Sequence, residues 1–112
     1  MNEISRRIAM EAGIRAVDRH DSYCLIRQRD TLRFLEACRA EEIVVLGIEG
    51  FLENGPNIIP DMNLIADFSE ISAKNWTERS CRSIEGAVGF VSAKADMPLI
   101  LFDFCLTQRE TI

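Results

Sequence analysis

Apolar side chains recur along this chain at helical spacing in three segments. Residues 3 to 19 carry them in two stripes and predict a first helix. Residues 30 to 40 predict a second, with Asp30 as its N-cap. Its buried side is expected to hold Leu32, Phe34, Leu35 and Cys38. Spacings of four and three predict a third helix, with Ser69 and Ser72 as alternative caps and a stripe of Ala73, Thr77, Cys81, Ile84, Val88, Val91 and Ala95.

Other segments are typical of strands. Residues 43 to 51 (IVVLGIEGF) and 58 to 68 flank a run of turn residues and predict a hairpin with a long loop. Residues 99 to 106 (LILFDFCL) are apolar on both faces apart from Asp103, which predicts a strand inside a sheet or beneath helices. A short run at 23 to 26 is compatible with a fourth strand. The order, roughly α-α-β-β-α-β, predicts an α+β fold with a small, mainly antiparallel sheet of three or four strands covered by helices.

Composition adds that the protein is acidic. The 112 residues include 18 acids and 13 bases, for a net charge of -5, and 47% are hydrophobic. This length favours a single domain spanning residues 1 to 112. Only two bases are lysines, and no basic cluster occurs, so we expect neither nucleic acid nor a membrane as partner. The charged N-terminus and the absence of a long apolar window predict a cytoplasmic location.

The cysteines do not form a recognisable motif. Cys24, Cys38, Cys81 and Cys105 include no CxxC pair. We therefore expect small core residues and neither a zinc site nor a redox pair. No cofactor and no resident metal are expected.

The negative charge is concentrated in one stretch. Residues 1 to 42 and 74 to 112 each sum to zero, whereas residues 43 to 73 contain five acids and no base. One interpretation is that arginines of the first part fold over this hairpin and neutralise it. The other is a binding face for a basic partner, because complementary potentials speed encounter and reject wrong partners. The candidate partner-binding residues are Glu49, Glu53, Asn54, Asn57, Asp61, Asp67 and Glu70.

Two alternatives stay open. Glu49, Asp67 and Asp103 lie one on each expected strand, so adjacent strands in register would let them bind Mg²⁺ or Mn²⁺ as a metal-dependent hydrolase. Strand register is not readable from the sequence, and outward-facing or arginine-paired carboxylates are the competing interpretation. The second alternative is a homo-oligomeric structural protein that pairs through an exposed strand or through Gly86 and Gly89.

The run from Val44 to Phe51 (VVLGIEGF), followed by residues 59 to 62 (IPDM) and 65 to 69 (IADFS), resembles the small bacterial immunity proteins of polymorphic toxin and contact-dependent growth inhibition systems. Such proteins are single cytoplasmic domains that bind and neutralise one cognate toxin. The resemblance lies within residues 44 to 69, about a quarter of the chain. It implies a protein that is not an enzyme and makes the acidic hairpin the expected contact with a basic toxin, such as a nuclease.

Overall fold

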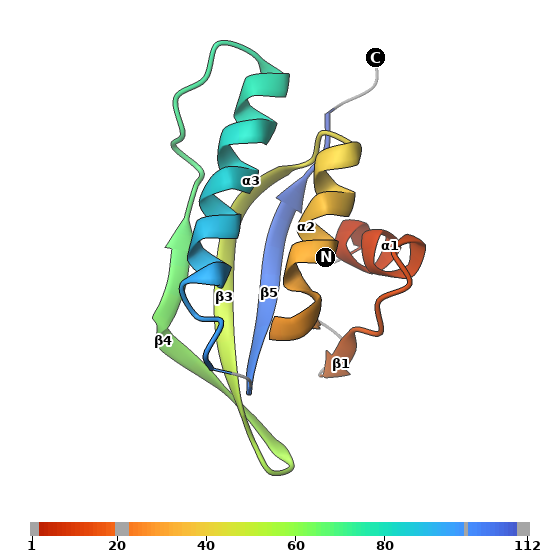
Figure 1. The fold of residues 1–112 in the computed structure, drawn as a ribbon, viewed down its shortest axis with the longest axis vertical. Coiled ribbons are helices and arrows are strands. Elements are labelled where there is room, and N and C mark those ends of the chain that lie inside the picture. The colour runs from red at the N-terminus through yellow and green to blue at the C-terminus, as the bar shows by residue number, and fades with distance from the viewer. Residues whose placement is uncertain (1–2, 20–22, 98, 110–112) are drawn as a thin grey trace.

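The computed structural model describes residues 3–19, 23–97 and 99–109 and alternates helices with antiparallel strands (Figure 1). The elements are α1 (Glu3–Glu11), β1 (Val17–Arg19), β2 (Tyr23–Arg27), a 3-10 turn η1 (Gln28–Asp30), α2 (Thr31–Ala40), β3 (Val44–Asn54), β4 (Asn57–Asp67), α3 (Trp76–Ser92) and β5 (Ile100–Thr107). None of the described helices is long and apolar enough to cross a membrane.

The strands form one antiparallel sheet in the order β1-β2-β5-β3-β4. The α+β class predicted from the sequence is confirmed. Strand β5 lies in the middle of the sheet, as its apolar composition on both faces predicts. The sheet includes β1, which forms from residues expected at the end of the first helix.

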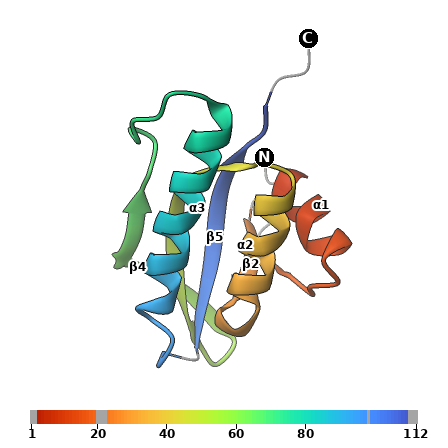
Figure 2. The same ribbon diagram turned by 45° about the horizontal axis from the view of Figure 1, so that its top comes forward.

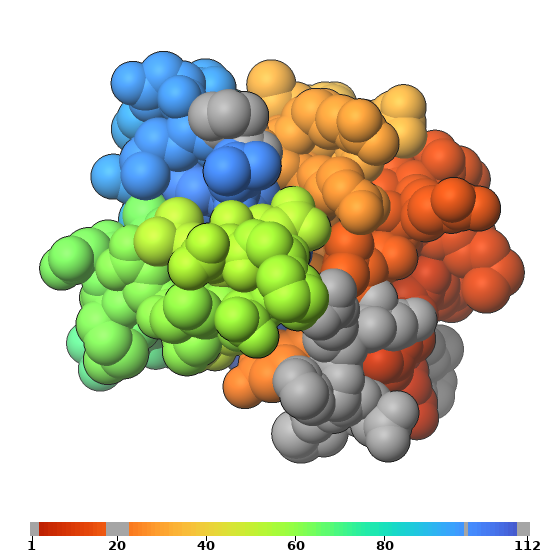
Figure 3. All heavy atoms as spheres, turned by 90° about the horizontal axis from the view of Figure 1, so that it is seen from below, coloured from red at the N-terminus to blue at the C-terminus, as the bar shows by residue number. Residues whose placement is uncertain are grey.

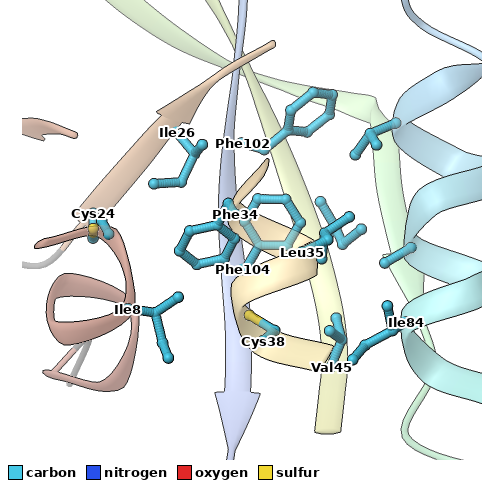
Figure 4. Close-up of a cluster of buried hydrophobic side chains, with 14 of the residues drawn as sticks. Ile8, Cys24, Ile26, Phe34, Leu35, Cys38, Val45, Ile84, Phe102 and Phe104 are labelled. Atoms are coloured by element: carbon cyan, nitrogen blue, oxygen red, sulfur yellow. The ribbon is translucent and has the colours of Figure 1, made fainter. Parts of the chain in front are cut away.

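All three helices pack on one face of the sheet. Figure 2 shows α2 and α3 side by side over β5. The main core lies between these layers (Figure 4) and joins helix residues such as Ile8, Phe34 and Ile84 to Phe102 and Phe104 of β5. A second, smaller cluster of buried residues, Leu25, Phe51 and Leu101, comes from strands alone and lies on the opposite face. We call this helix-free side the open face.

The first helix is shorter than expected. Its last turn closes with hydrogen bonds from Gly13 N–H to the Met10 carbonyl and from Ile14 N–H to the Ala9 carbonyl. This pattern needs a left-handed residue just after the helix, and Gly13 supplies it with φ +70°. The prediction of a helix to residue 19 was therefore wrong. Gly13 ends the helix here, because a glycine adopts the left-handed conformation without steric cost.

Helix α2 has the predicted position, but two details differ. Phe34, Leu35 and Cys38 are buried, and burial raises the pKa of the Cys38 thiol to about 12. Leu32 is 51% exposed, so its expected place on the buried side was wrong. Asp30 occupies the N-cap position, yet its side chain makes no capping hydrogen bond.

Helix α3 begins later than either serine predicted. Its N-cap is Asn75, whose side chain accepts a hydrogen bond from the Glu78 N–H at 2.8 Å. The buried face consists of Ser80, Ser83, Ile84, Ala87 and Val91. It is rotated relative to the predicted stripe because two serines face the core, where a hydropathy pattern expects apolar side chains.

These two serines connect α3 to β3. The Ser80 hydroxyl donates to the carbonyl of Ile43 at 2.6 Å, and the Ser83 hydroxyl accepts from the N–H of Val45 at 3.0 Å. A bulge interrupts the β3–β5 ladder between Val45 and Gly47. The serines thus satisfy backbone groups of β3 next to an irregular part of the ladder, which makes their burial favourable.

The hairpin is confirmed, although its connection is tight. Strands β3 and β4 pair up to Asn54 and Asn57, so only Gly55 and Pro56 remain in the loop. The predicted long loop was wrong because the turn residues around it extend the strands. Further along, the register shifts from Gly50 opposite Asp61 to Glu49 opposite Ile65, which leaves residues 62 to 64 as a bulge in β4.

Candidate functional site

The open face places acidic residues of three strands next to one another. Glu49 of β3 lies opposite Asp103 of β5 on one side and opposite Ile65 of β4 on the other. One step along, Gly47 lies between Asp67 and Cys105. Side chains two residues apart on a strand share a face, so both rows point away from the helices.

A hollow of about 320 Å³ lies between these two rows. Gly47, which has no side chain, is one of the residues that line it. Its lining residues are Leu46, Gly47, Ile48, Glu49, Ile65, Ala66, Asp67, Asp103 and Cys105. Three of them are acids and none is a base, so the hollow is a local region of negative potential.

Among the acids that line the hollow, Asp103 has a strongly raised pKa. Burial, and next the negative charge of Glu49, raise the pKa of its carboxyl to about 6. A hydrogen bond from the Cys24 backbone and the positive charge of Arg6 act in the opposite direction and only partly offset this. Among the described residues, the buried oxygen Oδ1 of Asp103 has no hydrogen-bond partner. This carboxylate is therefore held in an environment that favours a proton or a cation.

Asp67 is stabilised in its charged form. Its Oδ1 accepts hydrogen bonds from the Ser69 hydroxyl at 2.6 Å and from the Ser69 N–H at 2.9 Å. These bonds lower the pKa of Asp67 and end strand β4 in a local turn. The hollow is consequently lined by Asp67, whose pKa is lowered, and by Asp103, whose pKa is raised.

Glu53 lies on the same strand face but in different surroundings. It lines a separate depression of about 380 Å³ together with Arg27, Arg29 and Leu101. Two arginines of the first part thus line the same depression as Glu53, although Arg29 forms its salt bridge with Asp30. Several other arginines pair with acids of the helical layer: Arg7 with Glu11 and Glu41, Arg33 with Asp30, and Arg39 with Glu36.

The remaining candidates are dispersed. Asp61 pairs with Gly50, out of step with the open-face rows, and accepts a hydrogen bond from the Asn63 N–H within the β4 bulge. Asn54 and Asn57 flank the hairpin turn and are exposed. Figure 3 views this end of the molecule, where the yellow-green hairpin forms the front surface. Glu70 lies in the exposed segment after β4. Of the seven candidates, the structure brings only Glu49 and Asp67 to the hollow.

The three carboxylates considered for a metal site do gather around one hollow. Glu49, Asp67 and Asp103 all line it. Within the described part of the chain, however, no three acidic, histidine or cysteine side chains lie close enough together to hold a metal ion.

The structure also describes the two surfaces that the sequence suggested for self-association, an exposed strand and the side of Gly86 and Gly89. Strand β4 is an edge strand, but Pro60 and the bulge at residues 62 to 64 interrupt its regular edge. Gly86 is already covered, because a Cβ there would lie 2.8 Å from the ring of Phe68. A Cβ at Gly89 would have open space around it, with nothing within 4 Å.

Sequence reasoning assigned Asp103 only to the metal alternative and missed Gly47, Ile65 and Cys105. Cys105 is exposed on the open face, so its predicted core position was wrong. Alternation along β3 and β5 is visible in the sequence, and it would have put these residues on one face if the register had been known.

We compared the chain with protein-family models, with curated proteins and with solved structures, and none of the three comparisons found a match.

Proposed function

We propose that this protein is an immunity-type inhibitor that binds and neutralises a basic protein toxin through the acidic part of its open face. The observation that supports this most is the hollow lined by Glu49, Asp67 and Asp103 without a lining base. An uncompensated group of carboxylates on an uncovered sheet face favours a partner of opposite charge.

The proposed inhibitor works by binding alone. Its fixed carboxylates occupy the basic surface with which a toxin holds an anionic substrate, or its sheet covers the entrance to the toxin's active site. The proposal includes a cytoplasmic location, where an immunity protein meets an incoming toxin. It needs no cofactor and no catalytic residue of this chain.

The test is binding to the product of the neighbouring gene, because immunity proteins are expected to be encoded beside their toxins. Affinity is measured by calorimetry at low and high salt. We expect a clear loss of affinity as salt rises, since exposed charges beyond a Debye length of about 8 Å are screened at physiological ionic strength. Absence of binding, or an affinity that does not change with salt, would contradict the proposal.

A further inference from the structure

We infer that the end of the molecule around Arg27 and Arg29 is a docking site for a short segment of a partner protein, in which a carboxylate side chain lies next to an apolar one. The inference goes beyond the proposed function and does not rest on it, because it uses the opposite sign of charge at another place. Figure 3 views this end, where the yellow-green hairpin, the orange start of α2 and the blue end of α3 meet.

The site consists of two adjoining depressions. The smaller, of about 260 Å³, lies between the beginning of α2 and the end of α3, and we call it the apolar depression. The larger, of about 380 Å³, includes residues of β2, η1, β3 and β5, and we call it the arginine depression. Gln28, Arg29 and Ala95 line both. A peptide segment of a few residues can therefore reach the two depressions at once.

The arginine depression offers unused hydrogen-bond donors. Arg27 and Arg29 line it together with one acid, Glu53. Arg27 Nη1 donates to the Arg15 carbonyl at 3.4 Å, and Arg29 Nε lies 3.8 Å from Oδ2 of Asp30, which is too far for a hydrogen bond. None of the salt bridges within the described part of the chain joins Glu53 to either arginine. Both guanidiniums thus retain donors for a bound carboxylate.

The charge of this lining favours a single carboxylate. Two guanidiniums and one carboxylate leave a net charge of +1. One carboxylate of a partner neutralises that charge, whereas a phosphate dianion or a row of phosphates is repelled by Glu53. The neighbouring Asp30 does not remove the positive charge, because its Oδ1 also pairs with Arg33 at 3.5 Å.

The apolar depression gives the partner's next side chain a place to pack. Leu32, Val91 and Ala95 line it. Leu32 is 51% exposed, although its place in the sequence pattern predicts burial. An apolar side chain that covers Leu32 removes this surface from water and contributes to affinity.

The wall between the two depressions is fixed before any ligand binds. Gln28 Nε2 donates to the Val91 carbonyl of α3 at 2.9 Å, and the Thr31 hydroxyl donates to the Gln28 carbonyl at 2.8 Å. These bonds connect η1 to both helices. Binding therefore orders little beyond the arginine side chains, which lowers its entropic cost.

The experiment uses capped tripeptides and the isotopically labelled full chain at pH 7, with backbone amide shifts followed by NMR. The probe is N-acetyl-Leu-Glu-Leu-amide, which has an apolar side chain on each side of the carboxylate. N-acetyl-Leu-Gln-Leu-amide removes the charge, and N-acetyl-Ser-Glu-Ser-amide removes the apolar groups. We expect saturable shifts at Gln28, Arg29 and Ala95 with the probe, about tenfold weaker binding without the charge, and about threefold weaker binding without the apolar groups.

Variants locate the site. Arg29→Gln, at a side chain that is 79% exposed, should weaken binding of the probe about tenfold. Arg39→Gln, which loses the same charge near the other end of α2, should leave it unchanged. Glu53→Gln removes the negative charge from the lining and should strengthen binding about threefold.

The inference is overturned by an absence of saturable shifts around Arg29, by equal binding of the probe and either control peptide, or by equal effects of the two arginine variants. Unchanged or weaker binding in Glu53→Gln would also overturn it. Tighter binding of inorganic phosphate or of a single-stranded oligothymidine at these residues would assign the site to phosphate groups instead. Association of the chain with itself that Arg29→Gln abolishes would assign it to a second copy.

Discussion

Glu49 and Asp103 lie directly opposite each other on β3 and β5, and burial together with the negative charge of Glu49 raises the pKa of Asp103 to about 6. A carboxyl with a raised pKa binds its proton more tightly in the folded chain than in the unfolded chain. Its contribution to stability is therefore greatest at low pH and is lost as pH rises from 3.8 to about 6.

Asp103→Asn should consequently raise the free energy of unfolding at pH 7 by about 1 to 2 kcal/mol, which is below the full linkage value because the carboxyl is only partly buried. The gain should disappear at pH 3.5, where the native carboxyl is protonated. Urea denaturation at the two pH values measures both. Asp67→Asn is the matched control and should give no gain, because hydrogen bonds to Ser69 lower the pKa of Asp67. A loss of stability in Asp103→Asn at pH 7 would contradict the conclusion that burial and the charge of Glu49 destabilise the ionised carboxyl.

Ser83 connects helix α3 to the irregular start of β3. Ser83→Ala leaves the buried N–H of Val45 without its partner and should lower the free energy of unfolding by about 1 to 3 kcal/mol. Ser92→Ala, at an exposed position at the end of the same helix, should change it by less than about 0.5 kcal/mol. Equal effects of the two substitutions, measured by thermal or urea unfolding, would mean that the Ser83 bond contributes nothing.

The two glycines of α3 should respond with opposite signs. Gly86→Ala places a methyl group against the ring of Phe68 and should lower the free energy of unfolding by about 1 kcal/mol or more. Gly89→Ala meets open space and should raise it by about 0.5 to 1 kcal/mol, because alanine has the higher helix propensity. Paired denaturation curves decide this, and a gain for Gly86→Ala would refute the close packing of Phe68 on α3.

The N-caps of α2 and α3 provide another matched comparison. Asn75→Ala removes the hydrogen bond from the Glu78 N–H and should cost about 1 kcal/mol. Asp30→Ala should cost less than about 0.5 kcal/mol, because Asp30 makes no capping bond and faces Arg33 only at 3.5 Å on the surface. The reverse order of costs in unfolding experiments would contradict the described cap geometry.

Local pattern was sufficient where a segment's own residues determine its structure. The apolar run of β5 predicted a central strand, and the spacing of Phe34, Leu35 and Cys38 predicted the buried side of α2. Prediction failed at Ser83 because a distant group decides its place: the residue is buried where the N–H of Val45 needs an acceptor. It failed at Ser69 for a local reason, because this serine bonds to Asp67 in the turn after β4 and does not begin α3. The candidate site depends on register: one residue of slip would put Glu49 on the helical face, so its contact with Asp103 is a property of the folded sheet.

The central claim is that the acids around the hollow, and not acidity in general, bind the partner. It is tested most directly by the affinity for the neighbouring gene's product of two double variants that lose the same charge. One is Glu49→Gln with Asp67→Asn on the open face, and the other is Glu36→Gln with Glu85→Gln on exposed helix positions. We predict about a hundredfold loss of affinity for the first, from two charge-assisted contacts, and less than about a threefold loss for the second. Equal losses, or an unchanged affinity in the open-face variant, would contradict the account.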